Sequence, residues 1–379
     1  MRGLLSGDLH PLARLPALFL GMLSLAGGVL AGLARLDWQV PAIAAAAAGG
    51  HGALMIPAFF GTVISLERAV ALGQRWAYLA PATAGVGGVA LLAGAPLLLA
   101  QLLAVAAATV MVAASMQVLR RLMAPFTIVL LIGALCWLIG NLLWLVSGTV
   151  HVAVPWWLAF LVLTIAGERL ELSRFLPTPR MAQRVFLLIV GTIIAGALLC
   201  FWPGSAGSVL FSGGLLALAF WLLRFDIAWR NAKREGLPRF IAICLLGAYV
   251  WLVIAGLLGL AGGFEPAHAL RDSTLHAVGL GFVFSMVFGH APIIFPAVAR
   301  VKIPYHPVFY LPLLVLHLSL LGRVVGGVAG EGAAFALQRE GALANAFSLL
   351  LFIATMLVSV FRGRRKRGGD NVVRPPVCT

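Results

Sequence analysis

Two histidines close an apolar stretch of the chain, HAVGLGFVFSMVFGH at residues 276–290. Their imidazole rings carry polar nitrogens, and hydrocarbon offers these nitrogens no hydrogen-bond partner. The protein must therefore compensate His276 and His290, either by hydrogen bonds to neighbouring helices or by coordination of a metal ion. Coordination is the alternative that could do chemistry, because imidazole is the commonest metal ligand in proteins.

Two further histidines lie at matching depths in other apolar segments. At a helical rise of about 1.5 Å per residue, His290 lies about 21 Å deeper in the membrane than His276. We expect His51 at the depth of His276 and His317 at the depth of His290. Paired imidazoles are usual axial ligands of a b-type haem, and they also suit copper or non-haem iron. The sequence thus predicts two ligand pairs, for one or two haems or for a haem and a second metal. The alternative is that each histidine only hydrogen-bonds a neighbouring helix.

Other charged residues lie inside or beside these segments. We expect Arg323 near the outer end of its helix, where it could pair with the propionates of a haem held by the outer histidines. Alternatively, its side chain extends to the membrane interface. The pairs Glu67-Arg68 and Glu168-Arg169 are predicted to be neutralised pairs at the cytoplasmic surface, with proton uptake by either glutamate as the alternative.

The composition defines the class of protein that must position these residues. Of the 379 residues, 62% are hydrophobic and 10% charged, and the mean hydropathy is +1.04. A soluble domain carries about 25% charged residues, so the sequence predicts an all-α, polytopic integral membrane protein in a lipid bilayer. The positive-inside bias explains the net charge of +15 without nucleic acid. The four cysteines form no CxxC or CxxCH motif, which argues against a covalent c-type haem or a zinc cluster.

Apolar runs of about 20 residues predict the transmembrane helices. We expect twelve, at residues 15–35, 41–66, 76–95, 97–118, 125–147, 153–172, 184–203, 207–223, 239–262, 272–298, 307–326 and 342–361. They would form one transmembrane domain over residues 1–361, followed by a basic cytoplasmic tail at 362–379. We expect the first hydrophobic segment to be a span and not a cleavable signal peptide. With both termini in the cytoplasm, all basic residues but Arg35, Arg271, Arg323 and Arg339 fall on the cytoplasmic side.

A weak internal repeat relates three of these spans. The segments HGALMIPAFFGTVISLERAVAL and HVAVPWWLAFLVLTIAGERLEL begin at His51 and His151, and each ends near a Glu-Arg pair. They lie four helices apart, and four helices further on the tenth predicted span opens with His276. The pattern predicts three quasi-repeats of four helices, and it makes His151 a candidate third member of the outer histidine set.

The His-bearing segments HGALMIPAFFGTVI and LHAVGLGFVFSMVFGHAPI resemble the NnrS family of bacterial membrane proteins. The first span, LARLPALFLGMLSLAGGVLAGL, is also similar to that family. The resemblance implies about twelve inner-membrane helices, haem and copper, and a link to nitric oxide metabolism, with His51, His276 and His290 as motif histidines. The chain departs from the family where Gly49 and Gly52 replace a second histidine and an acid. A more distant likeness is to the catalytic subunit of haem-copper oxidases.

These observations leave three functions open. The first is a haem-bearing inner-membrane protein that binds, reduces or detoxifies nitric oxide, or that transfers electrons to or from a redox partner. The second is a cofactor-free transporter with twelve helices. The third is a factor that handles haem or copper during assembly of another enzyme. The sequence assigns no catalytic residue.

Overall fold

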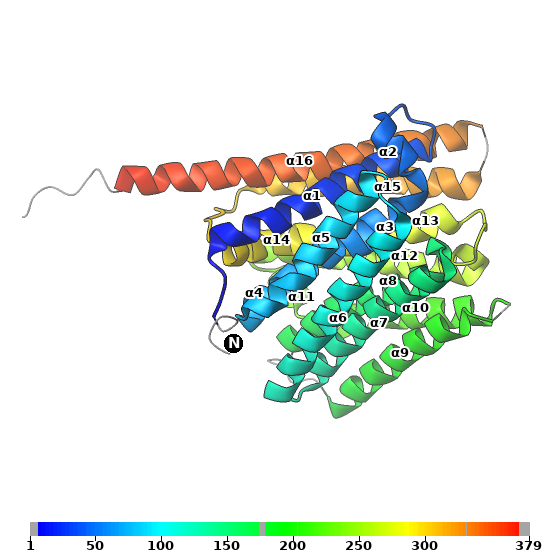
Figure 1. Cartoon of the computed structure of the whole chain (residues 1–379), viewed down its shortest axis with the longest axis horizontal. Coiled ribbons are helices and arrows are strands. Elements are labelled where there is room, and N and C mark those ends of the chain that lie inside the picture. Colours follow the sequence, from blue (N-terminus) through cyan, green and yellow to red (C-terminus); the bar gives the residue numbers. More distant parts are fainter. Residues whose placement is uncertain (1–6, 174–178, 203, 331, 371–379) are drawn as a thin grey trace, which may run out of the picture.

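The computed structural model describes residues 7–173, 179–202, 204–330 and 332–370, with side chains to 363. Over these residues the chain forms a bundle of long helices that run roughly parallel and antiparallel to one another (Figure 1). The described part contains no β-strand, and its one isolated bridge joins Gly7 to Gln74. The predicted all-α membrane architecture is confirmed. Most of the predicted basic tail lies outside the described side chains.

Eleven segments of the described chain are long and apolar enough to cross a membrane. In chain order they are α1 (Pro11–Ala34), the run η1 (Ala48–Gly50), α3 (His51–Ala53), η2 (Leu54–Phe60) and α4 (Gly61–Leu72), then α6 (Leu97–Arg121), α7 (Pro125–Ser147), α8 (Val150–Ser173), α9 (Arg180–Leu199), α10 (Ala206–Phe225), α12 (Leu237–Leu258) with η4 (Gly259–Gly263), the run α13 (Arg271–His276), η5 (Ala277–Phe284) and α14 (Ser285–Ala299), then α15 (Tyr310–Ala329) after η6 (Pro307–Phe309), and α16 (Ala333–Asp370). Each overlaps a predicted span. The short helices α2 (Ala42–Ala46) and α11 (Ala228–Asn231) lie between them.

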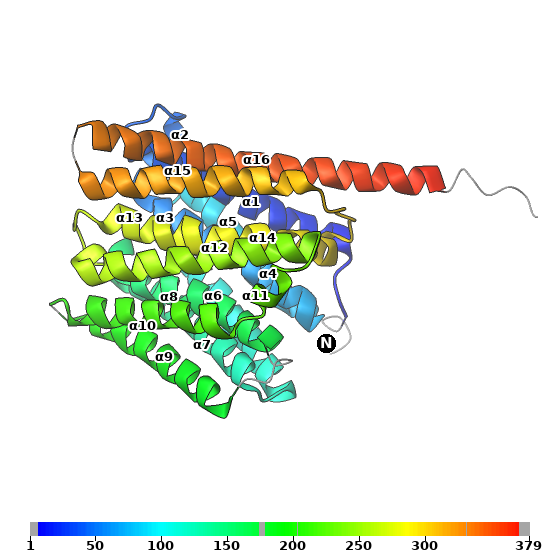
Figure 2. The ribbon, with the colours of Figure 1, turned by 180° about the vertical axis from the view of Figure 1, so that it is seen from behind.

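The remaining predicted span, at 76–95, forms a shorter element. Here η3 (Arg75–Tyr78) leads into α5 (Leu79–Leu92), which packs against α1, α4 and α6. Small residues allow this packing: a Cβ at Gly88 would lie 2.1 Å from Ser24 Oγ, and one at Gly85 would lie 2.8 Å from Leu20 Cβ. Because α1 begins and α16 ends at the same end of the bundle (Figures 1 and 2), α5 completes an even number of crossings.

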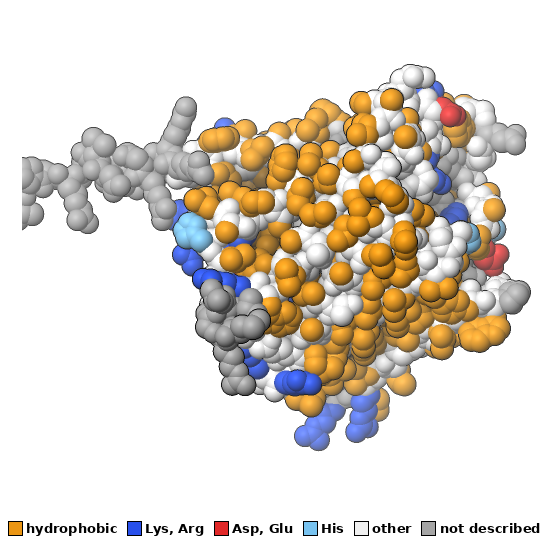
Figure 3. All heavy atoms as spheres, in the orientation of Figure 1, with side chains coloured by type: hydrophobic (Ala, Val, Ile, Leu, Met, Phe, Trp, Pro, Cys, Tyr) orange, Lys and Arg blue, Asp and Glu red, His pale blue; other side chains and the backbone are white. Residues whose placement is uncertain are grey.

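The two ends of the bundle differ in charge. We call the end where α1 begins and α16 ends the proximal end, and the opposite one the distal end. On the face shown in Figure 3, most Lys and Arg side chains gather at the proximal end, and hydrophobic side chains cover the surface between the ends. Exposed large apolar residues of the chain include Leu188, Leu318 and Leu350. Such a surface is suited to lipid, and the chain is a multi-pass membrane protein.

Two of the central segments contain wide helical turns. The segments η2 and η5 are π-helical over Leu54–Phe60 and Ala277–Phe284, and each follows a histidine of the predicted outer pair within three residues. π-Helical turns are rare and occur often at functional sites. Both belong to spans whose apolar windows are 67% buried, compared with 33% for α1, so they lie in the interior of the bundle.

Candidate functional site

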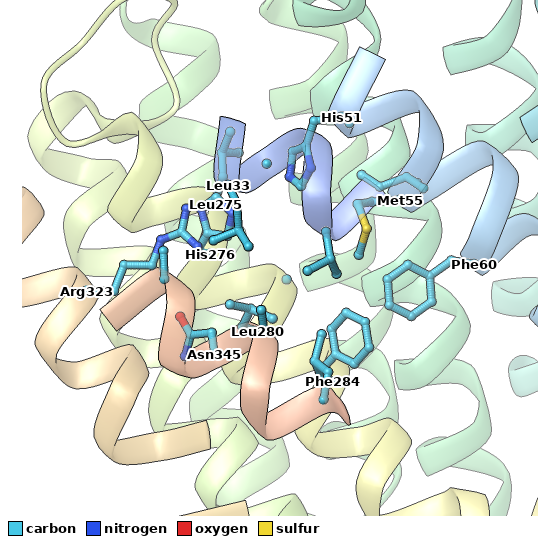
Figure 4. A pocket seen from close by; sticks show the side chains of 18 of the residues that line it. Leu33, His51, Met55, Phe60, Leu275, His276, Leu280, Phe284, Arg323 and Asn345 are labelled. Atoms are coloured by element: carbon cyan, nitrogen blue, oxygen red, sulfur yellow. The ribbon is translucent and has the colours of Figure 1, made fainter. Parts of the chain in front are cut away.

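A cavity in the distal half of the bundle lies between α1, α3, η2, α8, α13, η5, α15 and α16 (Figure 4). Its lining atoms enclose about 940 Å³ of empty space, the opening included. Four of its lining side chains carry polar groups, and the others are apolar or glycine. The polar ones are His51, His276, Arg323 and Asn345. A few convergent polar groups in a largely apolar cavity are typical of a ligand site.

His51 is held on one side of this cavity by α1. Its Nδ1 lies 2.7 Å from the carbonyl oxygen of Gly28. Because a carbonyl can only accept, Nδ1 carries the proton and Nε2 keeps its lone pair. The ring packs so closely on Gly32 that a Cβ there would lie 2.8 Å from Nδ1 and Cε1. The glycines of α1 therefore both orient His51 and make room for it.

His276 is oriented in the same way by its own helix. Its Nδ1 lies 2.8 Å from the carbonyl oxygen of Asp272 and 3.1 Å from the carboxylate Oδ1 of the same residue. This carboxylate also accepts hydrogen bonds from Arg323, at 3.0 Å and 2.9 Å, and from Gln338 at 3.1 Å. A carboxylate behind a histidine fixes its tautomer and makes its second nitrogen a better ligand. That second nitrogen is Nε2.

The two imidazoles lie across the cavity from each other (Figure 4). Their ring centroids are 6.0 Å apart and their planes meet at 25°. Two imidazole nitrogens bound to one metal at about 2.0 Å each would place the ring centroids roughly 6 Å apart. No hydrogen bond among the described residues engages either Nε2. The sequence prediction that His51 and His276 meet is confirmed, and metal ligation by them stays a prediction.

Arg323 lies at the same end of the cavity, but its partner differs from the expected one. Its guanidinium binds both carboxylate oxygens of Asp272, and its side chain is 8% exposed. It therefore does not extend to the interface, and its pairing with a ligand carboxylate stays a prediction. The predicted position of Arg323 near the outer end of its helix agrees with the structure. Asp272 was not predicted, although it precedes His276 by four residues and so shares its helix face.

The predicted pairing of His290 with His317 is not formed. His290 Nδ1 lies 2.8 Å from the Met286 carbonyl oxygen, and its Nε2 lies 3.4 Å from Nη1 of Arg169. The ring of His317 lies parallel to that of Trp251, and its Nδ1 accepts a hydrogen bond of 2.8 Å from Trp251 Nε1. The two histidines thus have separate partners on α8 and α12.

The packing against α12 explains this separation. A Cβ at Gly289, next to His290, would lie 3.0 Å from Cys244 Cβ, whereas a Cβ at Gly247 would lie 2.9 Å from Nε2 of His317. Since Trp251 also binds His317, that ring lies about one helical turn or more nearer the distal end. The prediction placed His290 and His317 at one depth because each lies the same number of residues from the membrane surface. The structure places them at different depths.

The proximal half contains a buried ion pair instead of the predicted Glu168-Arg169 pair. Arg169 binds Asp226 through Nε at 2.8 Å and Nη2 at 3.1 Å, and both side chains are buried. Asp226 also accepts the backbone N–H of Ala228 at 2.7 Å. The prediction was wrong because it paired sequence neighbours, whereas adjacent residues on a helix do not face each other.

Two other outcomes concern single residues. His151 lies exposed at the start of α8 and does not line the cavity, so it does not join His51 and His276. Met55 lines the cavity four residues after His51 and was not predicted as a site residue. Its signal was the four-residue spacing, which places His51 and Met55 on one helix face.

The described part of the chain contains no group of three or more His, Cys, Asp or Glu side chains that could hold a metal ion. His51 and His276 together therefore offer two nitrogens to a metal, and the Met55 thioether lines the same cavity. A porphyrin supplies four equatorial nitrogens of its own, so two axial imidazoles complete that ligand set. The residues present thus fit a haem better than a metal ion without a porphyrin.

Comparisons with known proteins give a family. A search of curated proteins finds no match. One family model matches residues 14–361, which include all the described spans nearly in full. The chain therefore belongs to the family described as Domain of unknown function (DUF8744).

Proposed function

We propose that this multi-pass membrane protein holds a b-type haem between His51 and His276. The observation that carries the proposal is the pair itself: two imidazoles 6.0 Å apart across an apolar cavity. On each ring Nδ1 is engaged by an oxygen of the protein, which leaves Nε2 for a ligand. Gly279 lines the same cavity, and a Cβ there would meet nothing within 4 Å, so a flat ring could approach the backbone.

The haem would supply one-electron chemistry, and the chain would position and tune it. His51 and His276 would hold the haem, and Asp272 would raise the basicity of His276. Apolar residues such as Leu158, Phe60 and Phe284 would keep water out of the cavity. Because two histidines of the protein would hold the haem, electron transfer is the role that this arrangement would favour.

We also propose that this chemistry serves nitric oxide metabolism in the bacterial inner membrane. The resemblance of the His51 and His276 segments to the NnrS family supports this part. The gathering of Lys and Arg at the proximal end (Figure 3) favours cytoplasmic termini, with the cavity in the periplasmic half. A redox partner in the membrane or periplasm would then exchange electrons with the haem.

Copper is a second candidate for the same cavity. The specific observation in its favour is Met55, whose thioether lines the cavity with His51 and His276. Two imidazoles and a thioether are a soft ligand set that suits Cu(I). Replacing Met55 by Leu should then remove copper, whereas a haem held by the two histidines would keep its absorption spectrum.

The first experiment is a pyridine haemochrome spectrum with metal analysis on protein purified in detergent. We expect one haem b per chain, lost in His51→Ala and in His276→Ala. His151→Ala is the matched control, because this histidine is exposed outside the cavity, and its spectrum should not change. Protein that purifies with neither haem nor metal, and takes up neither when supplied, would return both histidines to helix packing and favour a cofactor-free transporter. Haem binding without turnover would leave electron transfer or an assembly role.

A further inference from the structure

Four arginines stand out at the distal end, because the basic side chains on the visible face gather mainly at the other end (Figure 3). Two of the four are engaged by this chain. Arg323 binds the carboxylate of Asp272, and Arg339 stacks over Trp38 at 4.3 Å from the ring centroid and binds the Asp37 carbonyl oxygen at 3.0 Å. Arg35 and Arg271 are the other two.

Within the described part of the chain, neither Arg35 nor Arg271 has an acidic partner. Arg271 donates one hydrogen bond, to the Phe264 carbonyl oxygen at 2.5 Å, and Arg35 is exposed at the end of α1. Arg35 is close enough to act electrostatically on both Arg271 and His51. Two uncompensated cations from distant parts of the sequence therefore lie near each other, where their mutual repulsion has no counter-charge.

Their position relates them to the cavity. Arg35 follows Gly32 by three residues, and Arg271 precedes His276 by five, both toward the distal end. Along a helix axis these offsets are about 4.5 Å and 7.5 Å. We call these two arginines the distal mouth. By chain position both arginines therefore lie beyond these lining residues toward the distal end. Phe60 and Phe284 lie in another part of the cavity, away from Arg323 (Figure 4).

We propose that Arg35 and Arg271 bind the carboxylates of the cavity's ligand, which are the two propionates of a porphyrin. This assignment rests on the proposed haem function and adds the residues that recognise the ligand's anionic edge. A porphyrin carries both propionates on one edge and apolar substituents on the opposite edge. The distal mouth matches the first edge, and the part of the cavity lined by Phe60 and Phe284 matches the second. Guanidinium groups bind carboxylates with two parallel hydrogen bonds.

The test compares iron protoporphyrin IX with its dimethyl ester, in which both carboxylates are blocked. Full-length apoprotein in detergent is titrated with each ligand, and the bis-histidine absorption spectrum reports binding. Wild-type protein should bind the free acid more tightly than the ester. Each of Arg35→Gln and Arg271→Gln should weaken binding of the free acid roughly 3- to 10-fold, and the double variant should bind both ligands equally.

Arg339→Gln is the matched control, because Arg339 lies at the same end with partners outside the cavity. It should keep the wild-type preference for the free acid. Unchanged ester binding in the double variant would show that its cavity is folded. A double variant that kept the full preference would overturn the assignment of the distal mouth while leaving the haem proposal standing. Wild-type protein that bound neither porphyrin would overturn both.

Discussion

The distal cavity and the proximal half treat buried histidines in different ways. In each region a histidine Nδ1 is bonded to a backbone carbonyl oxygen, of Gly28 and Asp272 in one and of Met286 in the other. The difference lies in the second nitrogen. Arg169, itself held by Asp226, approaches Nε2 of His290, whereas Nε2 of the distal pair has no partner within the described chain. An intramembrane histidine is thus a candidate metal ligand only when its second ring nitrogen has no hydrogen-bond partner within the protein.

The largest effect should follow from breaking the proximal ion pair. Asp226→Asn would leave Arg169 buried and uncompensated, so we expect the free energy of unfolding to fall by about 3–5 kcal/mol. Denaturant unfolding in detergent would measure this change. Glu235→Gln removes an exposed acid and is the control, with an expected change within about 0.5 kcal/mol. An equally small change for Asp226→Asn would mean that the proximal pair does not stabilise the fold.

Two glycines two residues apart in η5 sharpen the comparison. A Cβ at Gly281 would lie 2.5 Å from Trp251 Cβ, so Gly281→Ala should cost about 1–3 kcal/mol of stability. Gly279 faces the cavity, so Gly279→Ala should be neutral or stabilising. Gly279→Leu should keep the fold but exclude the haem, as unfolding and haem titration would show. Haem binding unaffected by Gly279→Leu would argue against occupation of this cavity.

The carboxylate behind His276 should affect ligand binding more than folding. Asp272→Asn removes the charge that orients His276 and binds Arg323, and we expect metal or haem affinity to fall about 10- to 100-fold. The reduction potential of a bound haem should rise, because the His276 imidazole would become a weaker electron donor. Asp37→Asn, also at the distal end, is the control and should change neither quantity. A merely structural role for Asp272 would leave the potential unchanged.

The smallest effects on the cofactor should come from the other two histidines. His290→Gln and His317→Gln should leave the bis-histidine spectrum unaltered, because neither residue lines the cavity. His317→Gln should cost only the hydrogen bond from Trp251, about 0.5–1.5 kcal/mol of stability. Loss of the haem spectrum in either variant would contradict the distinction between the two regions.

The spans could be predicted because apolar runs of membrane length have few other structures available to them. The pairing of His51 with His276 followed from helical rise, which fixes depth. Depth does not fix direction around a helix axis, and for this reason His290 and His317 were paired wrongly. Asp226, which binds Arg169, was missed because the partner of a buried arginine depends on which helices pack together.

The π-helical segments show a second limit of prediction from sequence, which concerns local helix geometry. Length and hydropathy do not reveal that η2 and η5 adopt wide turns, because a π-helix needs no residue type that an α-helix lacks. In the cavity, His51 and His276 followed from residue type and depth. For Met55 and Asp272 the only signal was a spacing of four residues from one of these histidines, and their residue types alone did not mark them as part of a site.

Because the π-helical segment η5 lies between His276 and His290, the number of residues between them determines how the two side chains are rotated about the helix axis. A π-helical hydrogen bond spans one residue more than an α-helical one, so η5 sets the rotational phase between the two histidines. Deleting one residue within Ala277–Phe284 would leave the hydropathy almost unchanged. It would nevertheless rotate all that follows by about 100° and turn His290 away from Arg169. The rotation of this helix therefore couples the two halves of the bundle. An insertion or deletion within η5 would change side-chain orientation in one half relative to the other.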